Sequence, residues 1–255
     1  MYNLKEYGGK NLVLISKRRI EKNNHSTATK NIVGPAVLLV LDGWGLAPSW
    51  GGNAITLTNT PVFDGMWKDL PRAALSASGL AVGLPDGAPG NSEAGHLNIG
   101  AGRVVKQDQT VIDQQVESGE FFKNEKLVSV IKKSIKESRN IHVMGLLSDV
   151  GTHSHVHHLY QTLRLIKDLG GKNAIIHLFS DGRDSDPMRG VELIEQVESK
   201  IKEIGIGRIS TVSGRFYAMD RDNRWGRIAR VYNALTRCEA EKAEKARDIF
   251  TQSYA

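Results

Sequence analysis

The chain has 255 residues, of which 40% are hydrophobic and 24% are charged, an ordinary composition for a globular protein. Its longest aliphatic run, Ala36 to Leu41, has six residues, whereas a membrane-spanning helix needs about 20. The single cysteine, Cys238, excludes an internal disulfide and a zinc site built on cysteines. We therefore expect no membrane-spanning helix and a reducing, cytoplasmic setting.

The net charge of +6 is concentrated at the N-terminus. Residues 1–35 contain seven Lys or Arg and two Asp or Glu, a net charge of +5, so residues 36–255 carry only +1. Nucleic-acid binding needs basic and aromatic side chains on a face of the folded body, so we expect no such partner. Residues 1–35 have no sustained hydrophobic period, and we interpret them as a basic, disordered extension. An anchor for an acidic surface is the alternative.

From residue 36 onward, short apolar runs alternate with longer amphipathic segments, which predicts an α/β fold with parallel sheets. The polar stretch Arg103–Gln109 interrupts this alternation, so we place a domain boundary there, between residues 36–105 and residues 110–255. In chain order, the expected elements are a strand over Ala36–Leu41, a helix over Pro61–Leu70, a strand over Ala73–Ala77, a helix over Glu125–Glu137, a strand over Ile141–Leu147, a helix over Val156–Leu169, a strand over Ala174–Phe179, a helix over Met188–Ile204, a strand over Arg208–Val212, and helices over Arg224–Arg237 and Glu239–Thr251.

Polar residues follow four of the expected strands. In parallel α/β sheets, ligands bind beyond the carboxyl ends of the strands. One aspartate at such a place would be a helix cap more often than a ligand-binding residue, but four such places predict a polar site. The residues concerned are Asp42, Asp149, Asp181 and Arg215.

Ser92 lies between Gly90 and Gly95, where a helix is expected to begin. One interpretation is that Ser92 is a plain N-cap. The other is a nucleophile for phosphoryl transfer, which needs a base or a metal ion because a serine hydroxyl is a weak nucleophile at neutral pH. The glycine spacing differs from the Gly-x-Ser-x-Gly elbow, which excludes an α/β-hydrolase. A metal-activated Ser92 with Asp42 as an oxygen ligand remains.

Two further groups of side chains each have two interpretations. Four histidines could bind a metal ion, or one of them, His153, could contact an anionic substrate. Four arginines could hold phosphate and carboxylate groups in bidentate fashion, or they could form a salt-bridge network with nearby aspartates. The members are His153, His155, His157 and His158, and Arg183, Arg215, Arg221 and Arg224.

Five sequence motifs, which occur in the same order as in the family, make residues 36–255 resemble the cofactor-independent (2,3-bisphosphoglycerate-independent) phosphoglycerate mutase family. Small departures from the family pattern, at Ala94, Val150, Thr152 and Ser185–Asp186, remove no functional side chain. The motifs are Val37–Gly45, Gly90–Arg103, Ser148–His155, Asp181–Asp184 and Gly214–Trp225.

The resemblance implies interconversion of 3-phosphoglycerate and 2-phosphoglycerate through a phosphoserine at Ser92, without 2,3-bisphosphoglycerate as cofactor. Asp42 and Ser92 would bind one of two Mn²⁺ ions, although oxygen ligands suit Mg²⁺ equally. Asp184 would transfer a proton in the reaction, in addition to binding substrate. A metal-dependent phosphohydrolase or another phosphosugar mutase of the same superfamily is the alternative. The implied substrate-binding residues are His153, Arg183, Asp184, Arg215 and Arg221.

The resemblance also implies a domain arrangement. Residues 36–105 would be the first piece of an alkaline-phosphatase-like metal-binding domain, and residues 110–255 a largely complete but truncated α/β transferase domain. The family enzyme is about twice as long, and its remaining Asp and His metal ligands, catalytic Lys and further Arg pair have no counterpart here. We therefore expect an N-terminal fragment that is inactive alone, from an enzyme that is monomeric when complete.

Overall fold

The computed structural model describes residues 10–14 and 37–254. Its backbone contacts divide the chain into two compact units, Met1–Gln107 and Asp108–Ala255. We call them the N-terminal unit and the C-terminal unit, and we describe each by itself. The division falls inside the polar stretch Arg103–Gln109.

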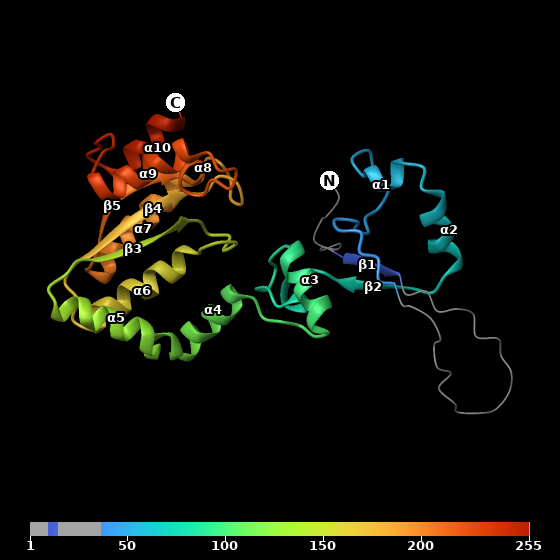
Figure 1. Cartoon of the computed structure of the whole chain (residues 1–255), viewed down its shortest axis with the longest axis horizontal. Helices are drawn as coiled ribbons and strands as arrows, with labels where there is room; N and C mark the ends of the chain where they lie inside the picture. Colours follow the sequence, from blue (N-terminus) through green and yellow to red (C-terminus); the bar gives the residue numbers. More distant parts are fainter. Residues whose placement is uncertain (1–9, 15–36, 255) are drawn as a thin grey trace. The chain divides into compact units, whose positions relative to one another are not determined.

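The C-terminal unit contains a three-stranded parallel sheet with the strand order β3-β4-β5 (Figure 1). One helix connects each strand to the next, as expected for parallel neighbours. The α/β fold with a parallel sheet is therefore confirmed for this unit. The elements are β3 (Ile141–Leu147), α6 (Val156–Asp168), β4 (Ala174–Ser180), α7 (Gly190–Ile204) and β5 (Arg208–Gly214).

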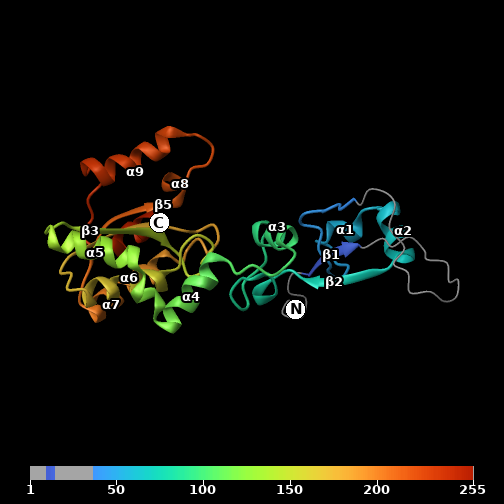
Figure 2. The same cartoon turned by 60° about the horizontal axis from the view of Figure 1, so that its bottom comes forward.

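Further helices cover both sides of this sheet. In Figures 1 and 2, α9 lies on the opposite side of the sheet from α5 and α6. No helix in the described part of the chain is long and apolar enough to cross a membrane. These elements are α4 (Asp108–Ser118), the 3₁₀ turn η3 (Glu120–Lys123), α5 (Glu125–Lys136), α8 (Arg215–Ala218), α9 (Trp225–Arg237) and α10 (Ala246–Tyr254).

The core of the C-terminal unit lies between the sheet and the helices α6 and α7. Apolar side chains of α6 and α7 recur at helical spacing and pack against alternate residues of the strands. This packing fixes the carboxyl ends of β3 and β4, from which the polar loops project. Side chains that are almost wholly buried include Leu147, Leu163, Ile166, Ile176, Leu193, Ile194 and Val197.

The N-terminal unit contains a two-stranded antiparallel sheet, in which Lys10 pairs with Ser76 and Leu14 with Arg72. The extension that we expected to be disordered therefore includes one strand, and residues 1–9 and 15–35 lie outside the described residues. The elements are β1 (Lys10–Leu14), α1 (Ala54–Leu57), α2 (Pro61–Asp69), β2 (Arg72–Ser76), the 3₁₀ turn η2 (Gly79–Val82) and α3 (Ser92–Ala101).

The predicted strand over Ala36–Leu41 is wrong for Val37–Leu41, the part that the structure describes. These five residues form no regular strand, and all of their side chains are exposed, from 41% at Val40 to 87% at Val37. An apolar strand of a parallel sheet needs neighbours on both edges and cover on both faces. In the described part of the N-terminal unit, β2 pairs with β1 instead.

Candidate functional site

In the N-terminal unit, the structure brings Ser92 and Asp42 together. The Ser92 hydroxyl lies 2.8 and 3.0 Å from the two carboxylate oxygens of Asp42. The cap of α3 is Asn91, whose side-chain oxygen accepts a hydrogen bond from the backbone N–H of Ala94 at 2.8 Å. The N-cap interpretation of Ser92 is therefore wrong, and its hydroxyl faces a carboxylate that can accept its proton.

Asp42 and Ser92 present carboxylate and hydroxyl oxygens, the donors that Mg²⁺ and Mn²⁺ prefer. Such ions take about six ligands, so these two residues fit one part of a site and cannot complete it. Among residues 10–14 and 37–254, no group of three or more His, Cys, Asp or Glu is arranged to hold a metal ion.

In the C-terminal unit, Asp181 is the centre of a hydrogen-bond network at the carboxyl ends of the strands. Its side chain is only 1% exposed. One carboxylate oxygen accepts the Ser148 hydroxyl at 2.8 Å. The other accepts the backbone N–H groups of Arg183 and Asp184 at 3.2 and 3.1 Å, and Nη1 of Arg215 at 2.5 Å.

This network keeps Asp181 ionised. Burial alone would raise the pKa of its carboxyl group, because charge is costly in a medium of low dielectric. The hydrogen bonds from the Asp184 backbone, Ser148, Arg215 and the Arg183 backbone outweigh burial and lower the pKa to about 2. The Asp181 carboxylate is thus a permanent negative charge beneath the site.

Arg215 joins Asp181 to Asp184. Its Nη1 lies 2.7 Å from a carboxylate oxygen of Asp184, and Nε2 of His153 lies 3.8 Å from that same oxygen. The Arg215 side chain is 11% exposed and the Asp184 side chain 24%. Burial would lower the pKa of Arg215, but Asp184 and Asp181 together raise it. A histidine, a carboxylate and an arginine therefore converge at one edge of the sheet.

The other two arginines implied to bind substrate, Arg183 and Arg221, lie in a different environment from Arg215. Arg183 and Arg221 are exposed, and within residues 37–254 their side chains form no ion pair. The salt-bridge alternative thus applies to Arg215, whereas Arg183 and Arg221 remain available to an anion. Arg224 donates its backbone N–H to Asp220, at 2.7 Å.

The remaining histidines have local structural roles. His155 caps α6 by accepting the backbone N–H of His157 at 3.1 Å. His158 lies 2.7 Å from Asp113, and the ring of His157 lies 2.7 Å from Gln161. Among the described residues these histidines do not form a group of three or more side chains arranged to hold a metal ion, so the structure does not support the metal interpretation.

Asp149, which also follows a strand, is paired with Arg189 at 2.7 Å. Asp181 was expected in a polar site because it follows a strand, but no specific role was predicted for Asp181 or Ser148. Their position in the sequence could have indicated the contact between them, because Ser148 and Asp181 each directly follow a buried apolar strand, and a buried polar residue requires a partner.

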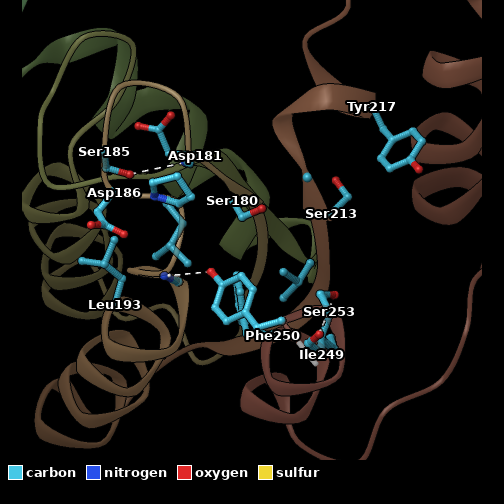
Figure 3. Close-up of a pocket in the computed structure, with 17 residues that line it drawn as sticks. Ser180, Asp181, Ser185, Asp186, Leu193, Ser213, Tyr217, Ile249, Phe250 and Ser253 are labelled. Atoms are coloured by element: carbon cyan, nitrogen blue, oxygen red, sulfur yellow. Dashed lines mark hydrogen bonds between the residues drawn. The ribbon is translucent and has the colours of Figure 1, made fainter.

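A cavity of about 260 Å³ lies beside the site, between the β4–α7 loop and α10. In Figure 3, Asp181 and Ser185 lie on one side of it and Ser213 and Tyr217 on the other. The Tyr254 hydroxyl accepts the backbone N–H of Gly190 at 3.2 Å, which fixes α10 at the floor of the cavity.

A sequence model described as the N-terminus of BPG-independent phosphoglycerate mutase matches residues 112–255. The chain belongs to the BPG-independent phosphoglycerate mutase family. Among curated mutases of this name, that of Clostridium perfringens (strain SM101) is 47% identical over 220 residues, and that of Lachnoclostridium phytofermentans is 48% identical over 221 residues. These alignments cover 86% and 87% of the chain, and the chain spans 43% of the length of each mutase.

A solved structure of a phosphoglycerate mutase from Leishmania mexicana, determined at low cobalt concentration, is also similar. It superimposes with a TM-score of 0.64 and 31% sequence identity, over 70% of this chain and 34% of that chain. This likeness agrees with the α/β fold described above.

Proposed function

We propose that the chain carries the serine nucleophile and the phosphoglycerate-binding residues of a mutase that interconverts 3-phosphoglycerate and 2-phosphoglycerate. The convergence of His153, Asp184 and Arg215 at the carboxyl edge of the sheet, in a chain of the mutase family, carries this proposal. Two positive or protonatable groups around one carboxylate suit a substrate that has both anionic groups and hydroxyl groups.

Arg215, Arg183 and Arg221 hold the anionic groups of the substrate. A guanidinium group binds carboxylate or phosphate through two parallel hydrogen bonds, which fixes the orientation as well as the position of the ligand. Arg215 is already held by Asp181 and Asp184, whereas Arg183 and Arg221 are exposed and close on the ligand from the loops.

Asp184 moves the proton of the substrate hydroxyl. Its carboxylate lies at the surface of the site, next to His153 at 3.8 Å, and is more exposed than Asp181. As the phosphoryl group leaves one hydroxyl of glycerate, that oxygen takes a proton, and the other hydroxyl gives one up when it accepts the phosphoryl group.

Ser92 accepts the phosphoryl group. The P–O bond to the 3-oxygen of the substrate breaks, and a P–O bond to Ser92 Oγ forms. The Ser92 hydroxyl gives its proton to Asp42, 2.8 Å away, and the 3-oxygen takes a proton from Asp184; the return step reverses both transfers, with the 2-hydroxyl giving its proton to Asp184. Glycerate then turns within the site, and its 2-hydroxyl takes the phosphoryl group from Ser92. The balance is an isomerisation that needs neither water nor 2,3-bisphosphoglycerate.

Asp42 and Ser92 would hold part of a metal site, and we propose Mn²⁺, with Mg²⁺ as an alternative. When bound, such an ion lowers the pKa of the serine hydroxyl and neutralises charge on the phosphoryl oxygens. Because Asp42 and Ser92 are too few to bind it alone, we propose that the 255-residue chain does not turn over by itself. We further propose that the complete enzyme is monomeric and cytoplasmic.

The test joins the chain to the C-terminal remainder of one of its relatives and supplies 3-phosphoglycerate with Mn²⁺. Formation of 2-phosphoglycerate without release of inorganic phosphate, lost in Ser92→Ala, is the expected result. Release of phosphate without 2-phosphoglycerate would instead support the phosphohydrolase alternative. Turnover by the 255-residue chain alone, above its Ser92→Ala control, would overturn the proposed dependence on further residues.

A further inference from the structure

We propose that Asp181, supported by Ser148, is a positioning residue. It holds the Arg215 guanidinium in place when substrate binds and the contact between Arg215 and Asp184 breaks. This inference rests on the proposed function, in which Arg215 binds the substrate and Asp184 transfers a proton. It assigns different roles to the two carboxylates that contact the same Nη1 atom, at 2.5 and 2.7 Å.

The two carboxylates differ in how firmly they are held. The Asp181 side chain is 1% exposed and accepts hydrogen bonds from a serine hydroxyl and two backbone N–H groups in addition to Arg215. The Asp184 side chain is 24% exposed, and its described contacts are Arg215 and, at 3.8 Å, His153. Anionic groups of the substrate can therefore replace Asp184 on Arg215. The Asp181 carboxylate cannot move without breaking its hydrogen bonds to Ser148 and to the backbone N–H groups of Arg183 and Asp184.

The exchange also resolves a conflict between binding and proton transfer. A carboxylate oxygen that is hydrogen-bonded to an arginine is occupied by that contact. If substrate takes the place of Asp184 on Arg215, that oxygen is free to face the substrate hydroxyl. Arg215 would then lose its orientation unless a second carboxylate kept it, and Asp181 is that carboxylate.

Ser148 connects this anchor to a third loop. Its hydroxyl donates to Asp181 at 2.8 Å and accepts the backbone N–H of Val150 at 3.2 Å. Val150 begins the segment that leads to His153. One buried carboxylate therefore connects the segments after β3, β4 and β5, which carry His153, Arg183, Asp184 and Arg215, four of the five proposed substrate-binding residues.

The first experiment examines the 255-residue chain without ligand. Slow rotation of the Arg215 guanidinium gives separate NMR resonances for Nη1 and Nη2, and fast rotation averages them. We expect separate resonances in the wild type and in Asp184→Asn, and averaging in Asp181→Asn. Averaging in Asp184→Asn, or separate resonances in a folded Asp181→Asn, would overturn the proposal. If Asp181→Asn does not fold, Ser148→Ala replaces it, with faster rotation than in the wild type as the expected result.

The second experiment titrates 3-phosphoglycerate into the same chain. Removing a negative charge near an anion site should tighten binding if Asp181 acts only through its charge. We expect the opposite, a loss of affinity of about tenfold or more in Asp181→Asn, with no further loss when Arg215→Gln is already present. Tighter binding, or a loss that adds to that of Arg215→Gln, would overturn the positioning role.

The matched control is Glu195→Gln, which removes one negative charge from an arginine pair outside the site, with Arg247 at 2.9 Å. Its affinity should equal that of the wild type. If the wild-type chain does not bind 3-phosphoglycerate at all, the proposed function fails for this chain. The NMR result still decides whether Asp181 or Asp184 holds Arg215, so the two failures are distinguishable.

Discussion

At the scale of single residues, His177 lies in an unusual position for a titratable side chain. It is 5% exposed in the middle strand of the sheet. Its two ring nitrogens lie 2.9 Å from the ring of His142 and 2.8 Å from the Thr211 hydroxyl, one on each neighbouring strand. Burial, followed by the proximity of His142 and Arg208, lowers the pKa of His177.

This lowered pKa predicts how stability changes with pH. The folded state favours neutral His177, so its contribution is fully present above the unfolded pKa of about 6.5 and is lost as pH falls. Between pH 7 and pH 5, the free energy of unfolding should therefore decrease, with a slope of at most about 1.4 kcal/mol per pH unit from this group. Burial also lowers the pKa of His155, which adds to the effect with the same sign.

Urea unfolding at several pH values measures this dependence. His177→Asn should reduce the slope, and His96→Asn, at an exposed position of the N-terminal unit, should leave it unchanged. If folded His177→Asn shows the same pH dependence of the free energy of unfolding as the wild type, His177 does not control stability in this pH range.

Some residue-level assignments follow from sequence and others do not. The polar residues after the strands predicted a polar site, because carboxyl ends of parallel strands share one edge, and Asp181 and Arg215 do lie together at that edge. The sequence could not show that Asn91 rather than Ser92 caps α3, since both residues are good caps and the choice depends on where Asp42 lies. The contacts of Ser148 and Asp181 depend on strand register and were not predictable.

At the scale of elements, the docking of α10 depends on a glycine of α7. A Cβ atom at Gly190 would overlap the Phe250 ring and the Tyr254 hydroxyl. Phe250 is 4% exposed and belongs to the core of the C-terminal unit. The absence of a side chain at Gly190 thus allows α10 to approach α7 and to close one side of the cavity in Figure 3.

Gly190→Ala should therefore displace α10 and destabilise the C-terminal unit by about 1–3 kcal/mol, the usual cost of overpacking. The backbone amide hydrogen-exchange rates of residues 246–254, which form α10, should all increase together. Gly226→Ala is the matched control, because it lies in α9 with open space around its Cβ position, and it should be neutral or stabilising by about 0.5–1 kcal/mol. Equal stabilisation by both substitutions would contradict the packing of α10 on α7.

The predicted elements of the C-terminal unit agree with the structure because each apolar run there finds a partner. Ile141–Leu147 was predicted at its observed bounds, since its residues pack on α6 and α7. Val37–Leu41 consists entirely of Val and Leu but has no strand neighbour in the described part of the chain. The last helix begins at Ala246 rather than Glu239, because residues 239–245 are polar or small and offer no apolar face.

At the scale of the whole molecule, the two units differ in the size of their cores. Among the described residues, sixteen buried apolar side chains form the main cluster, and all lie in the C-terminal unit. The cluster of the N-terminal unit has three, Val82, Leu84 and Ala94. Because buried apolar area is the main favourable term in folding, the C-terminal unit should be the more stable of the two.

We therefore expect two unfolding transitions, with the N-terminal unit unfolding at the lower urea concentration. Trp44, Trp50 and Trp67 report on the N-terminal unit, and replacing Trp225 by Phe removes the remaining tryptophan. In Trp225→Phe, the fluorescence transition should precede the far-ultraviolet circular dichroism transition. Coincident transitions would show that the two units unfold as one cooperative body.

The most direct test of the proposed phosphoglycerate site is a calorimetric titration of 3-phosphoglycerate into the 255-residue chain and into Arg215→Lys. We expect saturable binding at one site in the wild type. Loss of the planar guanidinium should weaken it by about tenfold or more, while Glu195→Gln should bind as the wild type does. Absence of saturable binding, or equal affinity in folded Arg215→Lys, would contradict the claim that these loops form the phosphoglycerate site.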